Sequence, residues 1–138
     1  MANEIVTRTA RHFIGDDGIV RSIMLPGAEQ TEGDAEENIR ACGTLLKEHQ
    51  RCPALIDYRR MRSMDRGART YYSGPEPARV MSAAAILIES PLSRIIGTFF
   101  MGLHKPLVPT RLFTSEAEAL AWLKASHPSP PSVARGLP

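Results

Sequence analysis

The sequence has few cysteines and no long apolar run. Only two residues are cysteine, Cys42 and Cys52, whereas a secreted domain of this size usually carries a larger even set that staples its loops. We therefore expect two reduced thiols and a cytoplasmic protein. The longest apolar stretch, near residues 95–103, is far shorter than the roughly 20 residues that a membrane-spanning helix needs. The first residues lack a basic start followed by an apolar segment, so no secretory signal is expected.

The sequence also has no large excess of positive or negative charge. The 17 basic and 15 acidic side chains give a net charge of +2, which is too small to draw the protein to nucleic acid or to an anionic membrane. The aromatic residues near the most basic segment are not interleaved with it as a base-stacking platform. The histidines and cysteines have no metal-ligand spacing, and no glycine-rich phosphate loop is present. No nucleic-acid partner, metal or cofactor is therefore indicated.

What is present is an ordinary globular composition. Apolar residues make up 43% of the chain, enough to close one core in 138 residues. We expect residues 1–126 to form this single domain. Residues 127–138 are rich in proline and should form a flexible, extended tail outside the core.

The first half of the chain predicts a hairpin, a helix and a buried strand. An Asp-Gly turn at 17–18 joins a strand over residues 7–14 to another over 19–25. Thr31 caps a long helix whose first turns are acidic and whose apolar positions keep helical spacing to residue 49. Residues 53–58 are mostly apolar, which is typical of a buried strand.

The second half predicts two further helices and another strand before the closing elements. Ser63 or Asp65 caps a short helix through residues 68–72. Residues 82–88 form a second buried strand, and a Ser-Pro pair then starts an apolar helix within residues 90–103.

The chain closes with a strand that runs directly into a helix. The strand covers residues 111–113, and Ser115 and Glu118 have the spacing of a capping box, with Thr114 as the alternative cap. Trp122 gives this helix a large apolar anchor. The full order is ββαβαβαβα, which predicts an α/β domain: a mixed sheet with an N-terminal antiparallel hairpin and helices packed on the sheet.

The core, residues 8–124, resembles the STAS superfamily and within it the bacterial SpoIIAA-like proteins, whose fold is related to that of CRAL-TRIO lipid carriers. The segments that carry the resemblance are Leu-Ile-Asp-Tyr-Arg-Arg-Met-Arg-Ser-Met-Asp at 55–65, Ser-Pro-Leu-Ser-Arg at 90–94, and Arg-Leu-Phe-Thr at 111–114 followed by Ala-Leu-Ala-Trp-Leu at 119–123. The resemblance implies a STAS or SpoIIAA-like mixed sheet and a non-enzymatic protein that works by docking a partner.

The resemblance also raises the question of a phosphorylation switch. In STAS proteins that oppose anti-sigma factors, the modified serine directly follows an aspartate at a helix start. Asp57 and Asp65 fit the two acidic positions of that pattern. However, Arg66 follows Asp65, Gly67 matches the small residue that comes next, and Ser63 lies two positions too early. The matching phospho-acceptor is therefore missing.

The sharpest charge feature is the arginine-rich segment that follows the strand at 53–58. It is expected where a strand ends and a helix begins, which is the usual ligand edge of an α/β sheet. The candidates for contact with a partner or an anion are Asp57, Arg59, Arg60, Arg62, Ser63, Asp65 and Arg66. Guanidinium groups bind carboxylates and phosphates through paired hydrogen bonds. The alternative is a solvated loop whose arginines pair with local acids.

The helix within residues 90–103 is the second candidate, because it is more apolar than one core-facing side requires. Its candidate residues for an apolar pocket or a dimer face are Ile96, Phe99, Phe100 and Leu103. Burial in the core is our first interpretation, a homodimer face the second and a lipophilic pocket the third, because a chain this short leaves little room for both a core and a cavity.

No catalytic group stands out in the sequence. A cysteine nucleophile would need Cys42 or Cys52 beside an oriented histidine, and their apolar context favours inert thiols. We therefore predict a non-enzymatic, STAS-like regulatory or protein-interaction module. A small lipophilic-ligand carrier is the second hypothesis, and an anion or nucleotide sensor acting through the arginine-rich loop is the third.

Overall fold

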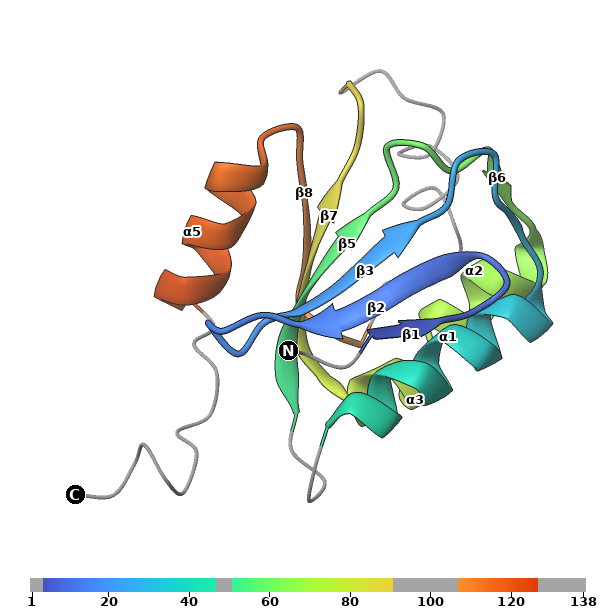
Figure 1. Ribbon diagram of the computed structural model, residues 1–138, viewed down its shortest axis with the longest axis horizontal. Coiled ribbons are helices and arrows are strands. Elements are labelled where there is room, and N and C mark those ends of the chain that lie inside the picture. Colours follow the sequence, from blue (N-terminus) through green and yellow to red (C-terminus); the bar gives the residue numbers. More distant parts are fainter. Residues whose placement is uncertain (1–3, 47–50, 91–106, 127–138) are drawn as a thin grey trace.

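The order of elements places strands and helices alternately along most of the chain (Figure 1). The computed structural model describes residues 4–46, 51–90 and 107–126. The strands are β1 (Glu4–Val6), β2 (Ala10–Ile14), β3 (Val20–Met24), β4 (Glu29–Gln30), β5 (Cys52–Asp57), β6 (Ser63–Met64), β7 (Met81–Leu87) and β8 (Thr110–Phe113). The helices are α1 (Glu32–Leu45), α2 (Arg66–Tyr72), α3 (Pro75–Ala78) and α5 (Glu116–Ser126).

Six strands form the main sheet in the order β1-β2-β3-β5-β7-β8. The first three are antiparallel, and β3, β5, β7 and β8 are parallel. The predicted mixed sheet with an antiparallel start is therefore confirmed. Because the four parallel strands point the same way, they end at one side of the sheet, which we call the carboxyl edge. Strand β2 runs the opposite way and begins there.

The predicted hairpin is formed by β2 and β3, and its tight turn needs a glycine. Gly18 N donates to Gly15 O at 3.0 Å, and Gly18 has a φ of 79°, which other residues rarely adopt. The first strand starts later than predicted, because Thr7 N donates to Ala10 O and residues 7–9 turn the chain from β1 into β2.

Three short strands and one short helix were not predicted. Strands β4 and β6 have two residues each and pair in parallel as a separate small sheet, while β1 has three residues. Such lengths are too short for a period in the sequence to show. Helix α3 has four residues and begins after Gly74, beyond the predicted end of the preceding helix at residue 72.

The predicted helix caps are largely confirmed. Thr31 caps α1, and its side chain accepts from Asp34 N while the Asp34 carboxylate accepts from Thr31 N. Asp65, rather than Ser63, caps α2 by accepting from Ala68 N at 2.9 Å. Helix α1 ends at Leu45, earlier than its apolar spacing suggested, because residue 46 adopts an extended conformation.

The closing strand and helix are also confirmed as β8 and α5. At the start of α5, Ser115 Oγ accepts from Glu118 N at 3.2 Å, which is one of the two bonds expected of the capping box. The ring centres of Phe113 and Trp122 lie 5.7 Å apart, so the anchor of α5 packs on the end of β8.

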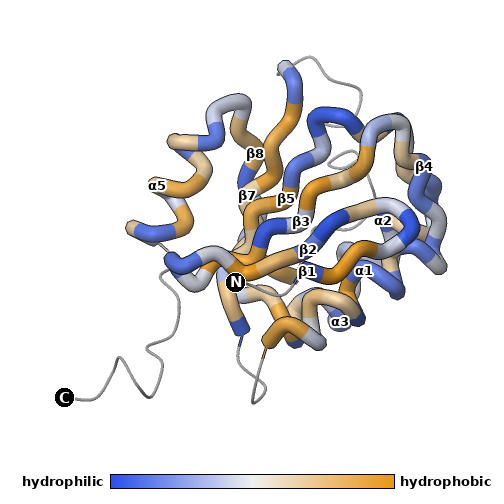
Figure 2. Tube along the Cα trace, viewed as in Figure 1, coloured by the Kyte–Doolittle hydropathy of each residue, from blue (hydrophilic) through white to orange (hydrophobic). Residues whose placement is uncertain are grey.

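Helices α1, α2 and α3 lie on one face of the sheet and α5 lies on the other (Figure 1). Apolar residues follow the central strands β5 and β7, as Figure 2 shows. The buried cluster under α5 consists of Ile19, Leu55, Ala83, Ala85, Leu87, Phe113, Ala119 and Leu123. The larger cluster on the other face includes Val20, Met24, Ile39, Cys42, Ile56, Tyr58, Met81 and Ile86. Within the described ranges, no helix has the length and apolar character needed to cross a membrane.

Candidate functional site

The carboxyl edge carries a hollow of about 500 Å³, which we call the edge hollow. Its charged lining comes from β2, from the end of β5 with the loop that follows, and from the segment after β7. Its apolar floor comes from the end of β3 and the following turn. The lining residues are Arg11, Ile23, Met24, Leu25, Pro26, Asp57, Arg59, Arg60 and Glu89. Ligands of α/β proteins commonly bind at this edge, so the edge hollow is the candidate site.

Strand register explains why Arg11 belongs to the edge hollow. Arg11 lies opposite Ile23, and Ile23 lies opposite Asp57, so the three form a row across β2, β3 and β5. Residues opposite one another on paired strands project from the same face. Arg11 was not among the predicted residues, because its place depends on strand pairing and not on a local pattern. Glu89 was missed for a similar reason. It follows β7, and the position of β7 within the sheet cannot be deduced from the sequence.

Asp57 and Arg59 form the most ordered part of the edge hollow. Arg59 Nε donates to Asp57 Oδ1 at 3.0 Å and its Nη2 donates to Oδ2 at 2.8 Å. Partial burial alone would raise the pKa of Asp57, but hydrogen bonds from Arg59 outweigh it and the pKa is lowered. Arg59 also lies 3.8 Å from Glu116 at the start of α5. The fork therefore lies next to the start of α5, the helix that packs over β5 and β7.

The remaining two arginines of the edge hollow are less engaged. Arg11 Nε donates to Glu4 at 2.6 Å, but both side chains are well exposed, and exposed ion pairs contribute little and exchange readily. Arg60 is exposed and has no ion pair among the described residues. Its backbone is fixed, because Gly27 N donates to Arg60 O at 2.8 Å and Gly27 has a φ of 76°. The edge hollow thus presents guanidinium groups that can donate hydrogen bonds to a group of another molecule.

The structure separates the other predicted residues from the edge hollow. Arg62 lies 3.3 Å from Glu29 in an exposed ion pair, and Ser63 belongs to β6. Asp65 is committed to capping α2. Arg66 is the first residue of α2 and is exposed. Of the seven candidates, only Asp57, Arg59 and Arg60 therefore meet in one place, while the other four lie along β6 and the start of α2.

A second group of polar side chains is buried between the strands β1–β3 and helix α1. We call it the His12 cluster, and it consists of Thr7, Thr9, His12, Ser22, Gln30, Asn38, Cys42 and Tyr72. His12 has no exposed surface. Asn38 lies at the centre: its Oδ1 is 3.2 Å from His12 Nε2, and its Nδ2 is 3.1 Å from both Gln30 Oε1 and the Tyr72 hydroxyl. These partners come from separate elements, which is why no sequence pattern predicted the cluster.

Cys42, His12 and Asn38 have the residue types of a cysteine nucleophile with an oriented base. Cys42 Sγ lies 3.8 Å from His12 Nδ1, but Ser22 Oγ lies closer to that nitrogen, at 2.8 Å. Burial raises the pKa of the Cys42 thiol and lowers the pKa of His12, so both groups are held neutral. The adjoining cavity is about 20 Å³, room for roughly one water. This geometry favours a structural role for the cluster.

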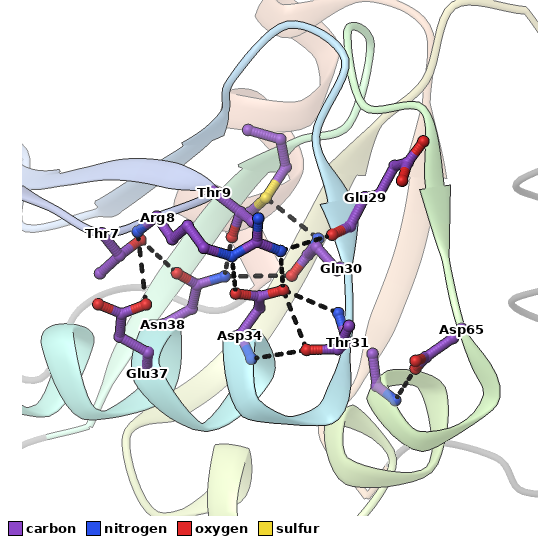
Figure 3. Close-up of polar contacts among 12 residues, drawn as sticks. Thr7, Arg8, Thr9, Glu29, Gln30, Thr31, Asp34, Glu37, Asn38 and Asp65 are labelled. Carbon is purple, nitrogen blue, oxygen red and sulfur yellow. Dashed lines mark hydrogen bonds and ion pairs between the residues drawn. The ribbon is translucent and has the colours of Figure 1, made fainter.

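The start of α1 is fastened to the β1–β2 turn by an ion pair (Figure 3). Arg8 Nε donates to Asp34 Oδ1 at 2.7 Å, and Arg8 Nη2 contacts Asp34 Oδ2 and the backbone oxygen of Glu29. The hydrogen bond from Arg8 is the main reason that the pKa of Asp34 falls to about 2. One arginine therefore holds the turn, β4 and the α1 cap together.

The second predicted site falls on residues that the structure does not describe: Ile96, Phe99, Phe100 and Leu103 lie outside the described ranges. Two mainly apolar cavities occur between the sheet and helices α1–α3, with volumes of about 30 and 20 Å³. Pockets for small organic ligands usually start near 300 Å³. These two cavities therefore give the carrier hypothesis no support. Among the described residues, no group of three or more His, Cys, Asp or Glu side chains is placed to hold a metal ion.

Comparison with known proteins gives a match to a family and a likeness to solved structures. Residues 13–127 match the domain of unknown function DUF7793. No curated protein matches the chain. Among solved structures, the chain is similar to an uncharacterised protein of the DUF3478 family with a SpoIIAA-like fold from Shewanella loihica PV-4. The sequence identity is 15%, the TM-score is 0.50, and the match covers 89% of this chain and 92% of that one. At this identity the likeness concerns the fold alone, and it confirms the predicted SpoIIAA-like mixed sheet.

Proposed function

The chain belongs to the DUF7793 family of domains of unknown function, and we propose that it acts without catalysis, as a module that binds an acidic group of a partner protein at the edge hollow. The observation that carries this proposal is the convergence of Arg11, Arg59 and Arg60 on one hollow at the carboxyl edge. Arginine suits such contacts because its planar guanidinium binds carboxylates with two hydrogen bonds and keeps its charge at every physiological pH.

The arrangement of the edge hollow fits a docking surface better than an active site. Its carboxylate Asp57 is engaged by Arg59 and kept ionised, so it is poorly placed to accept a proton as a general base. The thiols of Cys42 and Cys52 are buried on the opposite face of the sheet, and burial raises the pKa of both, so they are held in their protonated form. Neither Asp57 nor the two thiols therefore support a reaction at the hollow.

The proposal is tested by removing two positive charges from the edge hollow. The immobilised parent chain is incubated with an extract of its own host, and the retained proteins are measured by quantitative mass spectrometry. The Arg59→Ala/Arg60→Ala variant should no longer retain the proteins that bind to the parent chain. The matched control is Arg40→Ala/Arg79→Ala, which removes the same charge from α1 and from the end of α3 on the other face of the sheet. Thermal melting of both variants checks that the fold is retained.

The two variants separate a local contact from general charge attraction. Loss of the same proteins from both variants would mean that overall charge, and not the edge hollow, holds them. Retention of all proteins by the Arg59→Ala/Arg60→Ala variant would refute the proposal.

A further inference from the structure

The size of the edge hollow, the charge of its lining and its apolar floor indicate which kind of group it can bind. All three are set by residues that the structure describes. Its volume of about 500 Å³ lies within the range of roughly 300–1,000 Å³ that small-ligand pockets occupy. That volume is far more than one carboxylate or phosphate group needs. The occupant must therefore bring a carbon body with its charge.

The floor of the edge hollow fits such a body. Ile23, Leu25 and Pro26 line it, and Met24 beneath them is 3% exposed. The side chains of these residues are apolar and form no strong hydrogen bonds. They therefore favour contact with an apolar portion of an occupant.

The charge of the lining decides between a monoanion and a dianion. Among the lining residues three arginines face the two carboxylates Asp57 and Glu89, so the hollow has one excess positive charge once Arg11 releases its exposed partner Glu4. Asp57 is already matched by the Arg59 fork. A carboxylate with one negative charge would balance the excess, whereas a phosphate dianion would leave a net negative charge beside Glu89.

Arg60 and Arg11 are the groups best placed to meet this charge. The Arg60 backbone is held by Gly27 N at 2.8 Å while its side chain has no ion pair in the described part of the chain. Arg11 needs only to exchange an exposed partner, Glu4. Because the backbone at Arg60 is already fixed, binding has to order only its side chain.

The geometry points to a carboxylate site: the edge hollow binds one carboxylate with an apolar body, with Arg60 and Arg11 on the charge and Ile23, Leu25 and Pro26 against the carbon chain. This inference rests on the proposed function only for the source of the carboxylate, which we assign to an acidic residue of the partner protein and not to a free organic acid.

The site is tested with defined probes on the ¹⁵N-labelled 138-residue chain. Hexanoate supplies a carboxylate with an apolar chain, hexanamide is its neutral counterpart, and inorganic phosphate is the dianion. Arginine side-chain NMR signals should shift saturably with hexanoate at concentrations on the order of millimolar, as expected for one charged contact with a small apolar area. Hexanamide and phosphate should each bind at least about tenfold more weakly.

A pair of variants assigns the contact. Arg60→Gln keeps a polar side chain but removes the charge, and should weaken hexanoate binding about tenfold or more. Arg79→Gln on the other face should leave it unchanged. Equal binding of hexanamide, tighter binding of phosphate, or no saturable shift with hexanoate would each overturn the carboxylate site.

The source of the carboxylate is tested by adding saturating hexanoate to the capture experiment described above. Release of the retained partner supports an acidic residue of that partner in the hollow. Retention of the partner while hexanoate fills the hollow would overturn the assigned source. The Arg59→Ala/Arg60→Ala variant tests the proposed function separately. Failure of the carboxylate site can therefore be distinguished from failure of the proposed partner binding.

Discussion

At the scale of single residues, this domain buries a connected group of hydrogen-bonding side chains against one helix. The buried polar residues on the α1 side include His12, Gln30 and Asn38, which are 0%, 1% and 2% exposed. Each has partners among the other members of the His12 cluster. Satisfied networks of this kind stabilise one arrangement, while the loss of any member leaves the others unpaired in a medium of low dielectric constant.

His12 should make the stability of the domain depend on pH. Burial lowers its pKa in the folded protein below the usual value of 6.5, so the unfolded chain binds more protons as the pH falls. The free energy of unfolding should therefore be at its full value above pH 6.5 and decrease as the pH falls below it. Urea denaturation at pH 7.5 and at pH 5.5 measures the change.

The matched variant for this test is His12→Gln, which keeps a polar side chain but has no proton to gain in this range. Its stability should be lower than that of the parent at pH 7.5 and should change less between the two pH values. The same pH dependence in His12→Gln would assign the effect to another histidine. Asp34 does not interfere, since its lowered pKa of about 2 affects stability only when the pH falls below its usual value of 3.8.

At the scale of elements, the short helix α2 depends on its close approach to α1. Helix α2 has seven residues, too few to persist without tertiary contacts. Gly67 in its first turn faces Glu32 at the start of α1, and a Cβ at position 67 would lie 3.1 Å from Glu32 Cβ. The missing side chain of Gly67 therefore lets the two helix starts pack together.

The variant Gly67→Val should destabilise the domain by roughly 1–3 kcal/mol, because the added methyl groups force α1 and α2 apart. The control Gly33→Ala lies in α1, where the nearest atom to an added Cβ is Thr31 Oγ1 at 3.8 Å. It should be neutral or stabilising by up to about 1 kcal/mol, since alanine favours the helix. Urea denaturation measures both, and equal effects at the two positions would contradict the packing argument.

Local signals explain which elements and residues could be predicted from the sequence. The β2–β3 hairpin, the Thr31 and Ser115 caps and the strands β5 and β7 depend on neighbouring residues, and they were predicted. Asp57, Arg59 and Arg60 were also predicted, because they follow one strand directly. Arg11 and the β4–β6 pair were not, since each depends on the register or pairing of segments distant in the sequence. The His12 cluster required the whole α1–sheet interface.

At the scale of the whole molecule, the sheet joins two separate apolar clusters into one unit. Leu123 of α5 is fully buried in the cluster on one face, while Asn38 of α1 is buried on the other. The strands between them, above all β5 and β7, contribute side chains to both clusters. We therefore expect the two faces to unfold together, as is usual for single domains of this size.

Leu123→Ala should lower the free energy of unfolding by about 2–4 kcal/mol, because it leaves a cavity beneath α5. Leu120→Ala, at a half-buried position of the same helix, should cost less. The fluorescence of Trp122, the only tryptophan, reports on α5, and far-UV circular dichroism reports on the whole domain. In urea both signals should shift together for Leu123→Ala. A shift of the fluorescence transition alone would show that α5 detaches independently.

The alternation of β2 has a consequence for how this chain can change over evolution. Two adjacent residues of that strand serve opposite faces: Arg11 lines the edge hollow, and His12 lies in the buried polar cluster. A one-residue insertion or deletion between Thr9 and Arg11 would exchange the two faces, placing an arginine under α1 and a histidine at the hollow. Mutations in this strand should therefore survive as substitutions and not as changes of length, and the edge hollow and the interior should be inherited together.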